Sequence, residues 1–511
     1  MNKARRFIII HKLFITLILI AVPFRLYHLT YPILDSFNFR QAQTATFALN
    51  FYKHGINLFR TELDIFGIGR QKYLTLEFPI YEALVAVLYK LLFVSDIWGR
   101  LVSITFGFIG AWYLYKIVGL LIRNKKIAVY SIFFFIFAPL NMFYQRAFMI
   151  EPTIIALLLA GTFYYLEWVN YQDRKSYFLA LLLLTFGFMH KGLYGPFWLL
   201  PMVMYYLKKN SFKQIFSFKF LFVILVPLIL LFWWQHHVNS INTYAGHVFF
   251  TLTNPGQIEW NFGFFTDRLS ASEWSFRLHQ VLNGIFLKPG LIFFIIGLFV
   301  VKKIDKSNFF LFWIISQFIY FVTLFRIQQQ NYYQTIMVPA FSVLMAIGLS
   351  LTTDVINRKI RIIFKNKRLH FYVSRLMILF LFSTLIYKSW INTLPSFFVD
   401  WDWYQRLQAV KQVLPYNAYG ILVTPGVDWN SVYTYIPDRK MLQTSIENIT
   451  QENLLKWQNL GYSFLILHEY DKYQDYFAKE LKVPDNNYRE LLNNYKNVLD
   501  IQEFKVYFLS Q

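Results

Sequence analysis

Long apolar runs recur along the chain from the N-terminus to about residue 390, and short polar segments separate them. A run of about 20 apolar residues is long enough for a helix to cross a bilayer. The pattern therefore predicts a mainly α-helical, polytopic membrane protein with about eleven transmembrane helices. The expected spans lie near residues 7–24, 99–121, 127–145, 151–169, 176–190, 193–207, 219–235, 284–301, 308–325, 335–353 and 370–390.

Basic residues between the runs predict the orientation, because cytoplasmic loops carry an excess of Lys and Arg. Neighbouring basic clusters must then be separated by an even number of crossings, and the eleven spans meet this condition. The N-terminus is expected in the cytoplasm and the C-terminus outside a plasma (inner) membrane. The clusters lie at residues 3–6, 123–126, 174–175, 208–213, 302–306 and 358–368.

One apolar stretch, "IYEALVAVLYKLLFV" at Ile80 to Val94, is too short for a span and contains Glu82 and Lys90. Counting it as a crossing would move the basic cluster at 123–126 to the outside. A helix lying in the outer interface fits better. Residues 25–98 are therefore expected to form one long outer loop that contains an interfacial helix.

The pattern changes after Trp390. Segments "YGILVTP", "SFLILH" and "FKVYFL" are typical of short strands, and "ITQENLLKWQNLG" predicts a helix that ends at Gly461. We expect two domains, a membrane domain over residues 1–390 and a small extracytoplasmic α/β domain over residues 391–511.

Composition agrees with a membrane protein. Of the 511 residues 56% are hydrophobic and only 15% are charged, whereas soluble domains carry about 25% charged residues. The net charge of +22 follows from the basic clusters between spans, so no nucleic-acid partner is expected. There is no cysteine, which excludes disulfides and thiol chemistry.

With this topology the unusual polar side chains gather on the outer side. A charge at membrane depth costs about 2.5–3.5 kcal/mol on insertion scales, so several such residues on one side need a shared reason. Acids beside cations at the lipid boundary suit a site that holds an anionic headgroup and moves a proton. The residues are Asp35, Arg40, Arg70, Glu77, Arg146, Glu151, His190, Lys191, Arg326, Tyr332 and Tyr333.

Each of these residues also has a structural interpretation. Asp35 could cap a loop helix, and Glu151 before a proline suits the start of a span. Arg146 could pair with Glu151. Lys191 could reach the interface from a helix end, and tyrosines are common in aromatic belts.

Five motifs, in this order and spacing, resemble those of GT-C glycosyltransferases over roughly residues 1–350. The chain is similar to the family that contains protein O-mannosyltransferases and the aminoarabinose transferases of lipid A. The resemblance implies a GT-C fold and transfer of a sugar from a polyprenyl-phosphate carrier on the outer membrane face. The motifs are "LDSFNFRQAQTA", "LEFPIYEALVAVLYKLL", "RAFMIEP", "HKGLYGP" and "QQQNYYQTIMVP".

The resemblance also implies roles for single residues. Asp35 matches the catalytic acid, as general base, and Lys191 matches the lysine that binds the carrier phosphate. Arg40 lies near the family's loop arginine at a different spacing. Glu77 and Glu151 are expected as further catalytic residues that orient the acceptor or the cations, or that help to bind a divalent cation. The expected substrate-binding residues are Lys191, Arg40, Arg146, Arg326, Tyr332 and Tyr333.

Two departures separate the chain from protein mannosyltransferases. Ser36 follows Asp35 where those enzymes usually have a glutamate, and Glu151 stands where many relatives have aspartate. The acceptor therefore stays open among a glycolipid, a glycan and a protein. No rigid metal motif is present, so no obligatory cofactor is expected, with a divalent cation as the open alternative.

The alternative function is a transporter or flippase of a lipid-linked saccharide. Such a protein would also need a cationic groove near the lipid. It would more often show inverted repeats with broken helices in matching halves, and the sequence shows neither. A receptor or structural protein is the third class, and it leaves Glu77, Glu151 and Lys191 without a common purpose.

Overall fold

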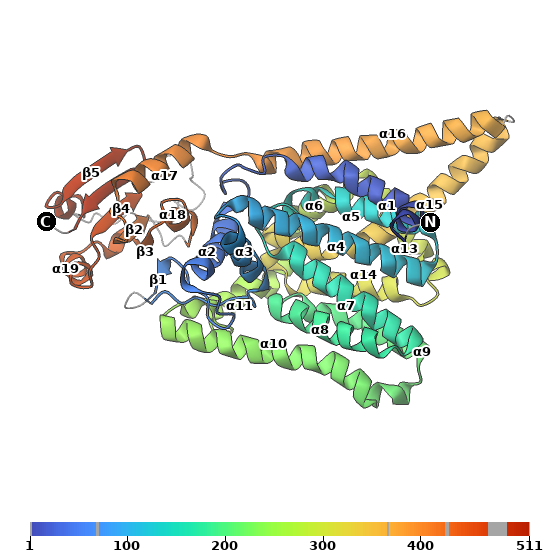
Figure 1. Ribbon diagram of the computed structural model, residues 1–511, viewed down its shortest axis with the longest axis horizontal. Coiled ribbons are helices and arrows are strands. Elements are labelled where there is room, and N and C mark those ends of the chain that lie inside the picture. The colour runs from blue at the N-terminus through green and yellow to red at the C-terminus, as the bar shows by residue number, and fades with distance from the viewer. Residues whose placement is uncertain (1–2, 68–70, 365–366, 425–428, 469–487, 510–511) are drawn as a thin grey trace. The chain divides into compact units, whose positions relative to one another are not determined.

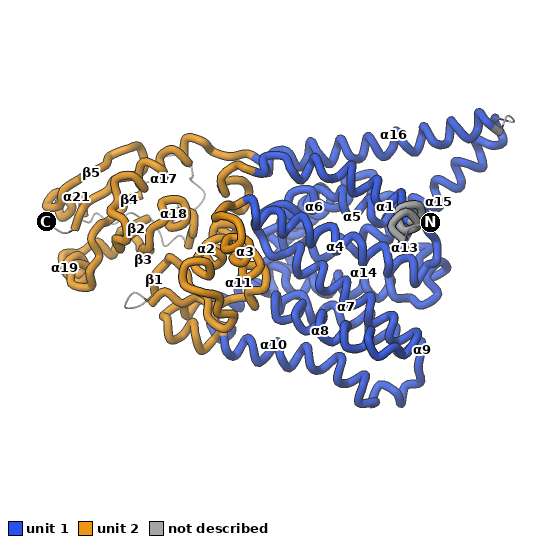
Figure 2. Tube along the Cα trace, in the orientation of Figure 1, with its two compact units in different colours: residues 1–29, 97–237, 252–397 blue, residues 30–96, 238–251, 398–511 orange. Residues whose placement is uncertain are grey.

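The computed structural model describes residues 3–67, 71–364, 367–424, 429–468 and 488–509. These residues form two compact units, shown in Figure 2. Unit 1 contains residues 1–29, 97–237 and 252–397, and unit 2 contains residues 30–96, 238–251 and 398–511.

Unit 1 consists of helices (Figure 1). In chain order they are α1 (Lys3–Leu26), α4 (Asp96–Ile122), α5 (Lys125–Phe137), α6 (Pro139–Tyr144), α7 (Glu151–Tyr171), α8 (Arg174–His190), α9 (Gly195–Lys209), α10 (Phe218–Ala245, whose end belongs to unit 2), α11 (Pro255–Phe262), α12 (Ala271–Val281), α13 (Pro289–Ile304), α14 (Phe309–Thr323), α15 (Val338–Ile363) and α16 (Lys367–Thr393).

The helices carry the apolar character expected of a membrane protein. Five described helical stretches are long and apolar enough to span a bilayer. The bent pair Ala271–Phe286 and Pro289–Ile304 would be a sixth. Each predicted span falls on a described helix or helix pair, while the count of about eleven crossings stays a prediction. Helix α16 exposes Leu376, Leu379 and Phe380, as expected of a helix that faces lipid.

Helices α7 and α8 pack closely because glycines lie at their contact. A Cβ at Gly161 of α7 would come within 2.8 Å of Leu184, and a Cβ at Gly187 of α8 within 2.9 Å of Leu158. Small residues let helix backbones approach in this way. The turn between the helices is short, and Asp173 caps α8 by accepting from Ser176 N at 2.8 Å. As a result, the start of α7 lies beside the end of α8.

Unit 2 joins the first loop, residues 30–96, to the C-terminal segment. The loop supplies α2 (Asn38–His54), strand β1 (Ile65–Phe66) and α3 (Ile80–Leu91), which is the helix predicted at Ile80–Val94. The C-terminal elements are α17 (Trp401–Val413), β2 (Tyr419–Thr424), α18 (Val432–Tyr435), β3 (Lys440–Ser445), α19 (Gln451–Asn459), β4 (Phe464–His468), α21 (Tyr488–Leu492), β5 (Lys496–Ile501) and β6 (Phe504–Phe508).

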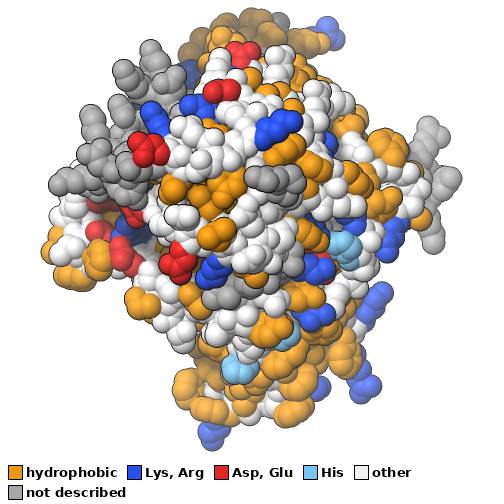
Figure 3. All heavy atoms as spheres, turned by 90° about the vertical axis from the view of Figure 1, so that its left-hand side faces the viewer, with side chains coloured by type: hydrophobic (Ala, Val, Ile, Leu, Met, Phe, Trp, Pro, Cys, Tyr) orange, Lys and Arg blue, Asp and Glu red, His pale blue; other side chains and the backbone are white. Residues whose placement is uncertain are grey.

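The six strands form one mixed sheet in the order β1-β3-β2-β4-β6-β5. Strands β1, β3, β2 and β4 are parallel, and β6 and β5 are antiparallel to their neighbours. Strand β4 is buried along its whole length, as a strand covered on both faces should be. The face of the molecule in Figure 3 has interspersed acidic and basic side chains, which is typical of a water-exposed surface.

The predicted strands at "YGILVTP", "SFLILH" and "FKVYFL" and the helix before Gly461 are confirmed as β2, β4, β6 and α19. Strands β1, β3 and β5 were not predicted. The division into domains at residue 390 stays a prediction, and the first loop packs within unit 2.

Candidate functional site

Glu151 and Lys191 form a buried ion pair in unit 1. Lys191 Nζ lies 2.5 Å from Glu151 Oε1, and the two side chains are only 3% and 1% exposed. Glu151 is the first residue of α7, and Lys191 is the C-cap residue of α8. An acid at a helix N-terminus and a cation at a helix C-terminus both interact favourably with the helix dipole. The attraction between the two charges and the interaction of each charge with its helix dipole therefore all favour this pair.

Aromatic rings surround the ammonium group of Lys191. The group lies 4.3 Å from the ring centre of Tyr333 and 5.1 Å from those of Tyr332 and Tyr194. Ring faces attract a cation, and the attraction is strongest where water is excluded. We call Glu151, Lys191, Tyr194, Tyr332 and Tyr333 the ion-pair site. The Lys191 side chain is buried against Glu151 and these rings and does not extend to the surface of the protein.

The tyrosines are themselves held in place. Tyr332 and Tyr333 belong to the 3₁₀ segment Asn331–Met337, which precedes α15. Tyr144, at the end of α6, donates to Asn331 Oδ1 at 2.5 Å. Tyr320 donates to the carbonyl of Tyr333 at 2.9 Å. These bonds fix the segment that presents the rings to Lys191.

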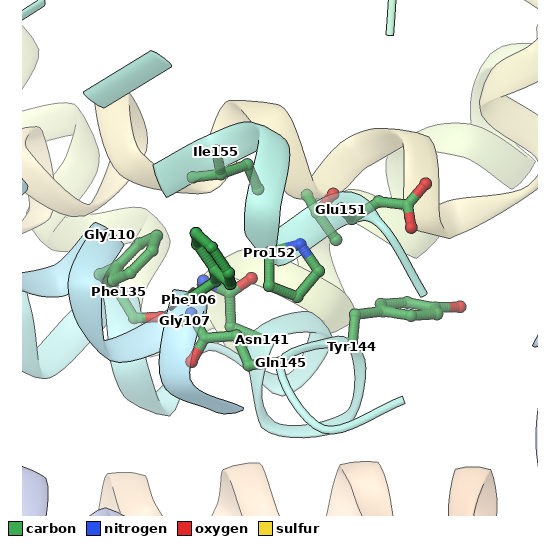
Figure 4. A pocket seen from close by; sticks show the side chains of 11 residues that line it. Phe106, Gly107, Gly110, Phe135, Asn141, Tyr144, Gln145, Glu151, Pro152 and Ile155 are labelled. Carbon is green, nitrogen blue, oxygen red and sulfur yellow. Dashed lines mark hydrogen bonds between the residues drawn. The ribbon is translucent and has the colours of Figure 1, made fainter. Parts of the chain in front are cut away.

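A small cavity adjoins Glu151 (Figure 4). Its volume is about 10 Å³, and its lining includes Phe106, Phe135, Pro152 and Ile155. A cavity of this size holds about one water molecule. In Figure 4 the Glu151 carboxylate points away from the end formed by Phe106 and Phe135. This space does not accommodate a sugar.

The two oxygens of the Glu151 carboxylate have different surroundings. Oε1 accepts from Lys191, whereas the buried Oε2 has no hydrogen-bond partner among the described residues. A buried polar atom without a partner costs about 1–3 kcal/mol. Oε2 is therefore a ready acceptor for a hydroxyl group or for a proton.

A second group of predicted residues lies in the first loop, in unit 2. Arg40 forms an ion pair with Glu77 and donates to Gln43 Oε1 at 2.7 Å. Gln41 Nε2 donates to Asp35 Oδ1 at 2.5 Å. We call these five residues the first-loop group.

Asp35 does not occupy the N-cap position of the helix that follows it. The N-cap residue of α2 is Phe37, which makes no side-chain cap. Asp35 is 2% exposed and Arg40 8% exposed. The side chain of Glu77 is the more open at 19%. The Asp35 carboxylate thus accepts a hydrogen bond from a glutamine side chain, and the neighbouring residue of that glutamine, Arg40, pairs with Glu77.

The two remaining predicted cations have different surroundings. Arg146 is fully buried and donates to the carbonyls of Tyr27 and His28 at 3.1 and 2.7 Å. These contacts hold the chain just after α1. Arg326 forms an ion pair with Glu259, and both side chains are about one-third exposed. Glu151 pairs with Lys191, so the expected Arg146–Glu151 pair is wrong. Substrate binding by Arg146 and Arg326 stays a prediction.

Several residues of these groups were not singled out from the sequence. Tyr194 lies within the motif "HKGLYGP", and Gln41 and Gln43 lie within "LDSFNFRQAQTA". Tyr144 lies two residues before the motif that begins at Arg146. Arg70 lies outside the described residues. Among the residues that the structure describes, no cluster of three or more His, Asp or Glu could hold a metal ion. The expectation of no obligatory metal stays a prediction.

Comparison with known proteins identifies the fold. No family model and no curated protein matches the sequence. The crystal structure of ArnT from Cupriavidus metallidurans bound to undecaprenyl phosphate superposes with a TM-score of 0.65 at 12% identity, over 97% of both chains. The apo structure of the same protein gives a TM-score of 0.63 with equal identity and coverage.

The archaeal oligosaccharyltransferase AglB from Archaeoglobus fulgidus, in complex with an inhibitory peptide and a dolichol-phosphate, is also similar. It gives a TM-score of 0.51 at 11% identity, over 89% of this chain and 69% of that chain. ArnT and AglB are GT-C fold enzymes. The chain therefore has a GT-C fold, and the resemblance stated from the sequence is confirmed for the fold.

Proposed function

We propose that this chain is an integral-membrane glycosyltransferase. It moves a sugar from a polyprenyl-phosphate carrier to a glycolipid, glycan or protein acceptor on the outer face of the membrane. The GT-C fold supports the class, because the similar structures are those of ArnT with undecaprenyl phosphate and of AglB with a dolichol-phosphate.

The observation that carries the proposal is the buried Glu151–Lys191 pair. A buried ion pair is weak evidence for stability alone, because apolar residues of similar volume are often equally stabilising. Lys191 is a desolvated ammonium group among tyrosines, and Glu151 Oε2 has no hydrogen-bond partner among the described residues. The ammonium group is proposed to attract a phosphate oxygen, and Oε2 is proposed to accept a hydrogen bond from a sugar or acceptor hydroxyl.

The reaction is a displacement at the anomeric carbon. An acceptor oxygen or nitrogen forms a new bond to that carbon, and the bond from carbon to phosphate oxygen breaks. The electron pair leaves with the phosphate, so charge grows on the leaving carrier. A fixed cation such as Lys191 stabilises this growing charge. Arg40, Arg146 and Arg326 are the further candidates for this role.

The acceptor must lose a proton, and Asp35 is the proposed base. Its hydrogen bond from Gln41 orients the carboxylate, which general-base catalysis requires. The Arg40–Glu77 pair is proposed to orient the acceptor beside Asp35. Glu151 is proposed to orient Lys191 and to bind a substrate hydroxyl.

Release of the carrier tests the proposal without knowledge of the sugar. The purified protein in nanodiscs is supplied with a lipid extract and a cell-surface extract from a strain that lacks it, and free undecaprenyl phosphate is measured by mass spectrometry. Time-dependent release that needs the protein is expected. An unchanged pool of carrier in the presence of protein and cell-surface extract contradicts the proposal. A transporter would leave the bond between sugar and phosphate intact, so the assay also separates the two functions.

A further inference from the structure

The first loop and the C-terminal segment share one sheet (Figure 1). Strand β1 of the loop pairs in parallel with β3, Ile65 beside Met441 and Phe66 beside Leu442. Met441 N donates to the carbonyl of Asp64 at 2.9 Å. A two-residue strand has no stability of its own, so its position depends on the C-terminal sheet.

Side chains of β1 and its neighbours anchor the loop on both faces of this strand. Phe66 belongs to the hydrophobic core of the C-terminal sheet, with Ile421 and Leu465 among its members. Ile65 belongs to a second cluster, formed with loop residues, against which Trp429 of the C-terminal segment packs.

Two polar contacts fix the ends of the loop to the region around α18. Lys53, in the last turn of α2, lies 2.9 Å from Asp438 Oδ1. Tyr435, the last residue of α18, donates a hydrogen bond to Asp96 at the start of α4. Helix α18 also packs against α2.

Helix α2 and the segment before Glu77 connect this part of the loop with the first-loop group. Asn50 of α2 donates to the carbonyl of Glu62 at 3.0 Å and to Asp64 Oδ1 at 3.2 Å, which ties α2 to the segment before β1. Asn242 exchanges two hydrogen bonds with the backbone of Thr75 at 2.9 and 2.8 Å, two residues before Glu77. The other end of α2 carries Arg40 and Gln41.

We propose that the C-terminal segment positions the first-loop group for catalysis, with Tyr435 and Asp438 as positioning residues. The inference rests on the proposed function, because it assigns the segment a role in the same reaction. Misplacement of reacting groups by about 1 Å from a distant change can reduce the rate about a hundredfold. Contacts remote from Asp35 and Glu77 can therefore control turnover.

The test uses Tyr435→Phe, Asp438→Lys and the charge swap Lys53→Asp/Asp438→Lys in the full-length protein. Carrier release and hydrogen exchange are both measured. The matched controls are Tyr433→Phe, whose hydroxyl faces His468 Nδ1 at 3.3 Å, and Lys126→Asp, which breaks the ion pair with Asp354 in unit 1.

We expect the single variants to lower kcat about tenfold or more with KM for the lipid extract unchanged. Amide exchange over residues 38–66 should become faster while β2 and β4 stay protected. The charge swap should restore both measurements, and the controls should behave as wild type.

Wild-type turnover and exchange in both single variants would overturn the inference, as would a charge swap that restores neither. Absence of carrier release by the wild-type protein would instead overturn the proposed function. In that case the exchange data alone decide, and unchanged exchange over residues 38–66 would refute the coupling.

Discussion

The ion-pair site and the first-loop group are both pairs of acids and cations, but they differ in how much of each pair water can reach. The Lys191 and Glu151 side chains are 3% and 1% exposed, whereas those of Arg40 and Glu77 are 9% and 19% exposed. Helix termini fix the first pair, and a loop supported by the C-terminal sheet carries the second.

This difference has a physical consequence for each group. A fully desolvated pair must stay balanced, because removal of one partner leaves an unpaired charge in a medium of low dielectric constant. In the first-loop group water reaches mainly Glu77, while Asp35 is 2% exposed. The proposed roles are charge stabilisation for the ion-pair site and proton transfer to Asp35 for the first-loop group.

The largest expected effect is on turnover, for Asp35→Asn. Asparagine keeps an oxygen that can accept from Gln41 Nε2, but it cannot take a proton. General-base assistance is worth about 10²–10⁴ in rate, so carrier release should fall by that factor. Binding of undecaprenyl phosphate, measured by native mass spectrometry, should change little because the carboxylate does not hold the phosphate.

Asp305→Asn is the control for this change. Asp305 is a buried carboxylate of unit 1 that has no proposed role in the reaction, so turnover should be retained. Near-normal carrier release by Asp35→Asn would show that Asp35 is not the base and has a structural role. Glu77 and Glu151 would then be the candidates for the base.

The next largest effect is on stability, for the ion-pair site. Lys191→Met leaves Glu151 buried without a partner, which is expected to destabilise unit 1 by about 3–5 kcal/mol. The double variant Glu151→Leu/Lys191→Met removes both charges and should recover most of this stability, measured by thermal unfolding in detergent. Turnover should stay low in both variants, because the fixed cation is absent.

Recovery of turnover together with stability in the double variant would contradict the proposed site. The pair would then be a structural feature of the α7–α8 contact. Lys126→Met, in the exposed ion pair with Asp354, is the control, since exposed pairs are worth about 0–1 kcal/mol.

Local patterns account for what the sequence could predict. Long apolar runs marked the helices, and shorter apolar segments marked β2, β4 and β6. Glu151, Lys191, Tyr332 and Tyr333 lie in three of the motifs and meet in unit 1, while their roles in substrate binding stay a prediction. Lys191 had an alternative interpretation as an interfacial lysine, because no local pattern shows which partner a helix end will meet.

Features that depend on distant contacts could not be predicted in this way. Strand β1 consists of two residues and pairs with β3, which lies more than three hundred residues further along the chain. Arg146 belongs to the same motif as Glu151, "RAFMIEP". Its side chain nevertheless donates to the carbonyls of Tyr27 and His28. Tertiary packing, which leaves no local signal, decides such choices.

The smallest expected effect is on the pH dependence of stability, and it concerns Asp64 in unit 2. Asp64, next to β1, is buried, and this burial raises the pKa of its carboxyl above the ordinary value of 3.8. Lys440, Lys53 and the hydrogen bond from Asn50 oppose the shift, and Asp438 adds to it. The folded state thus binds the Asp64 proton more tightly than the unfolded state does. Ionisation of Asp64 therefore destabilises the folded state. This destabilisation is absent when the pH is below the ordinary pKa and is fully present once the pH exceeds the raised pKa.

Asp64→Asn removes this destabilisation. The variant should therefore unfold at a higher temperature than wild type at pH 7.5, and the gain should shrink as the pH falls towards 4. Burial lowers the pKa of His247 and His468 from 6.5 to about 4, so both reduce stability as the pH falls below 6.5. This reduction is common to wild type and variant and cancels in the difference between their melting temperatures. Asp500→Asn, at an exposed position of β5, should show no gain. A gain that is independent of pH would show that the buried charge is not its cause. The higher Tm would then come from improved packing around Asn50. The contrast between a paired charge in unit 1 and an unfavourably buried charge in unit 2 would be wrong.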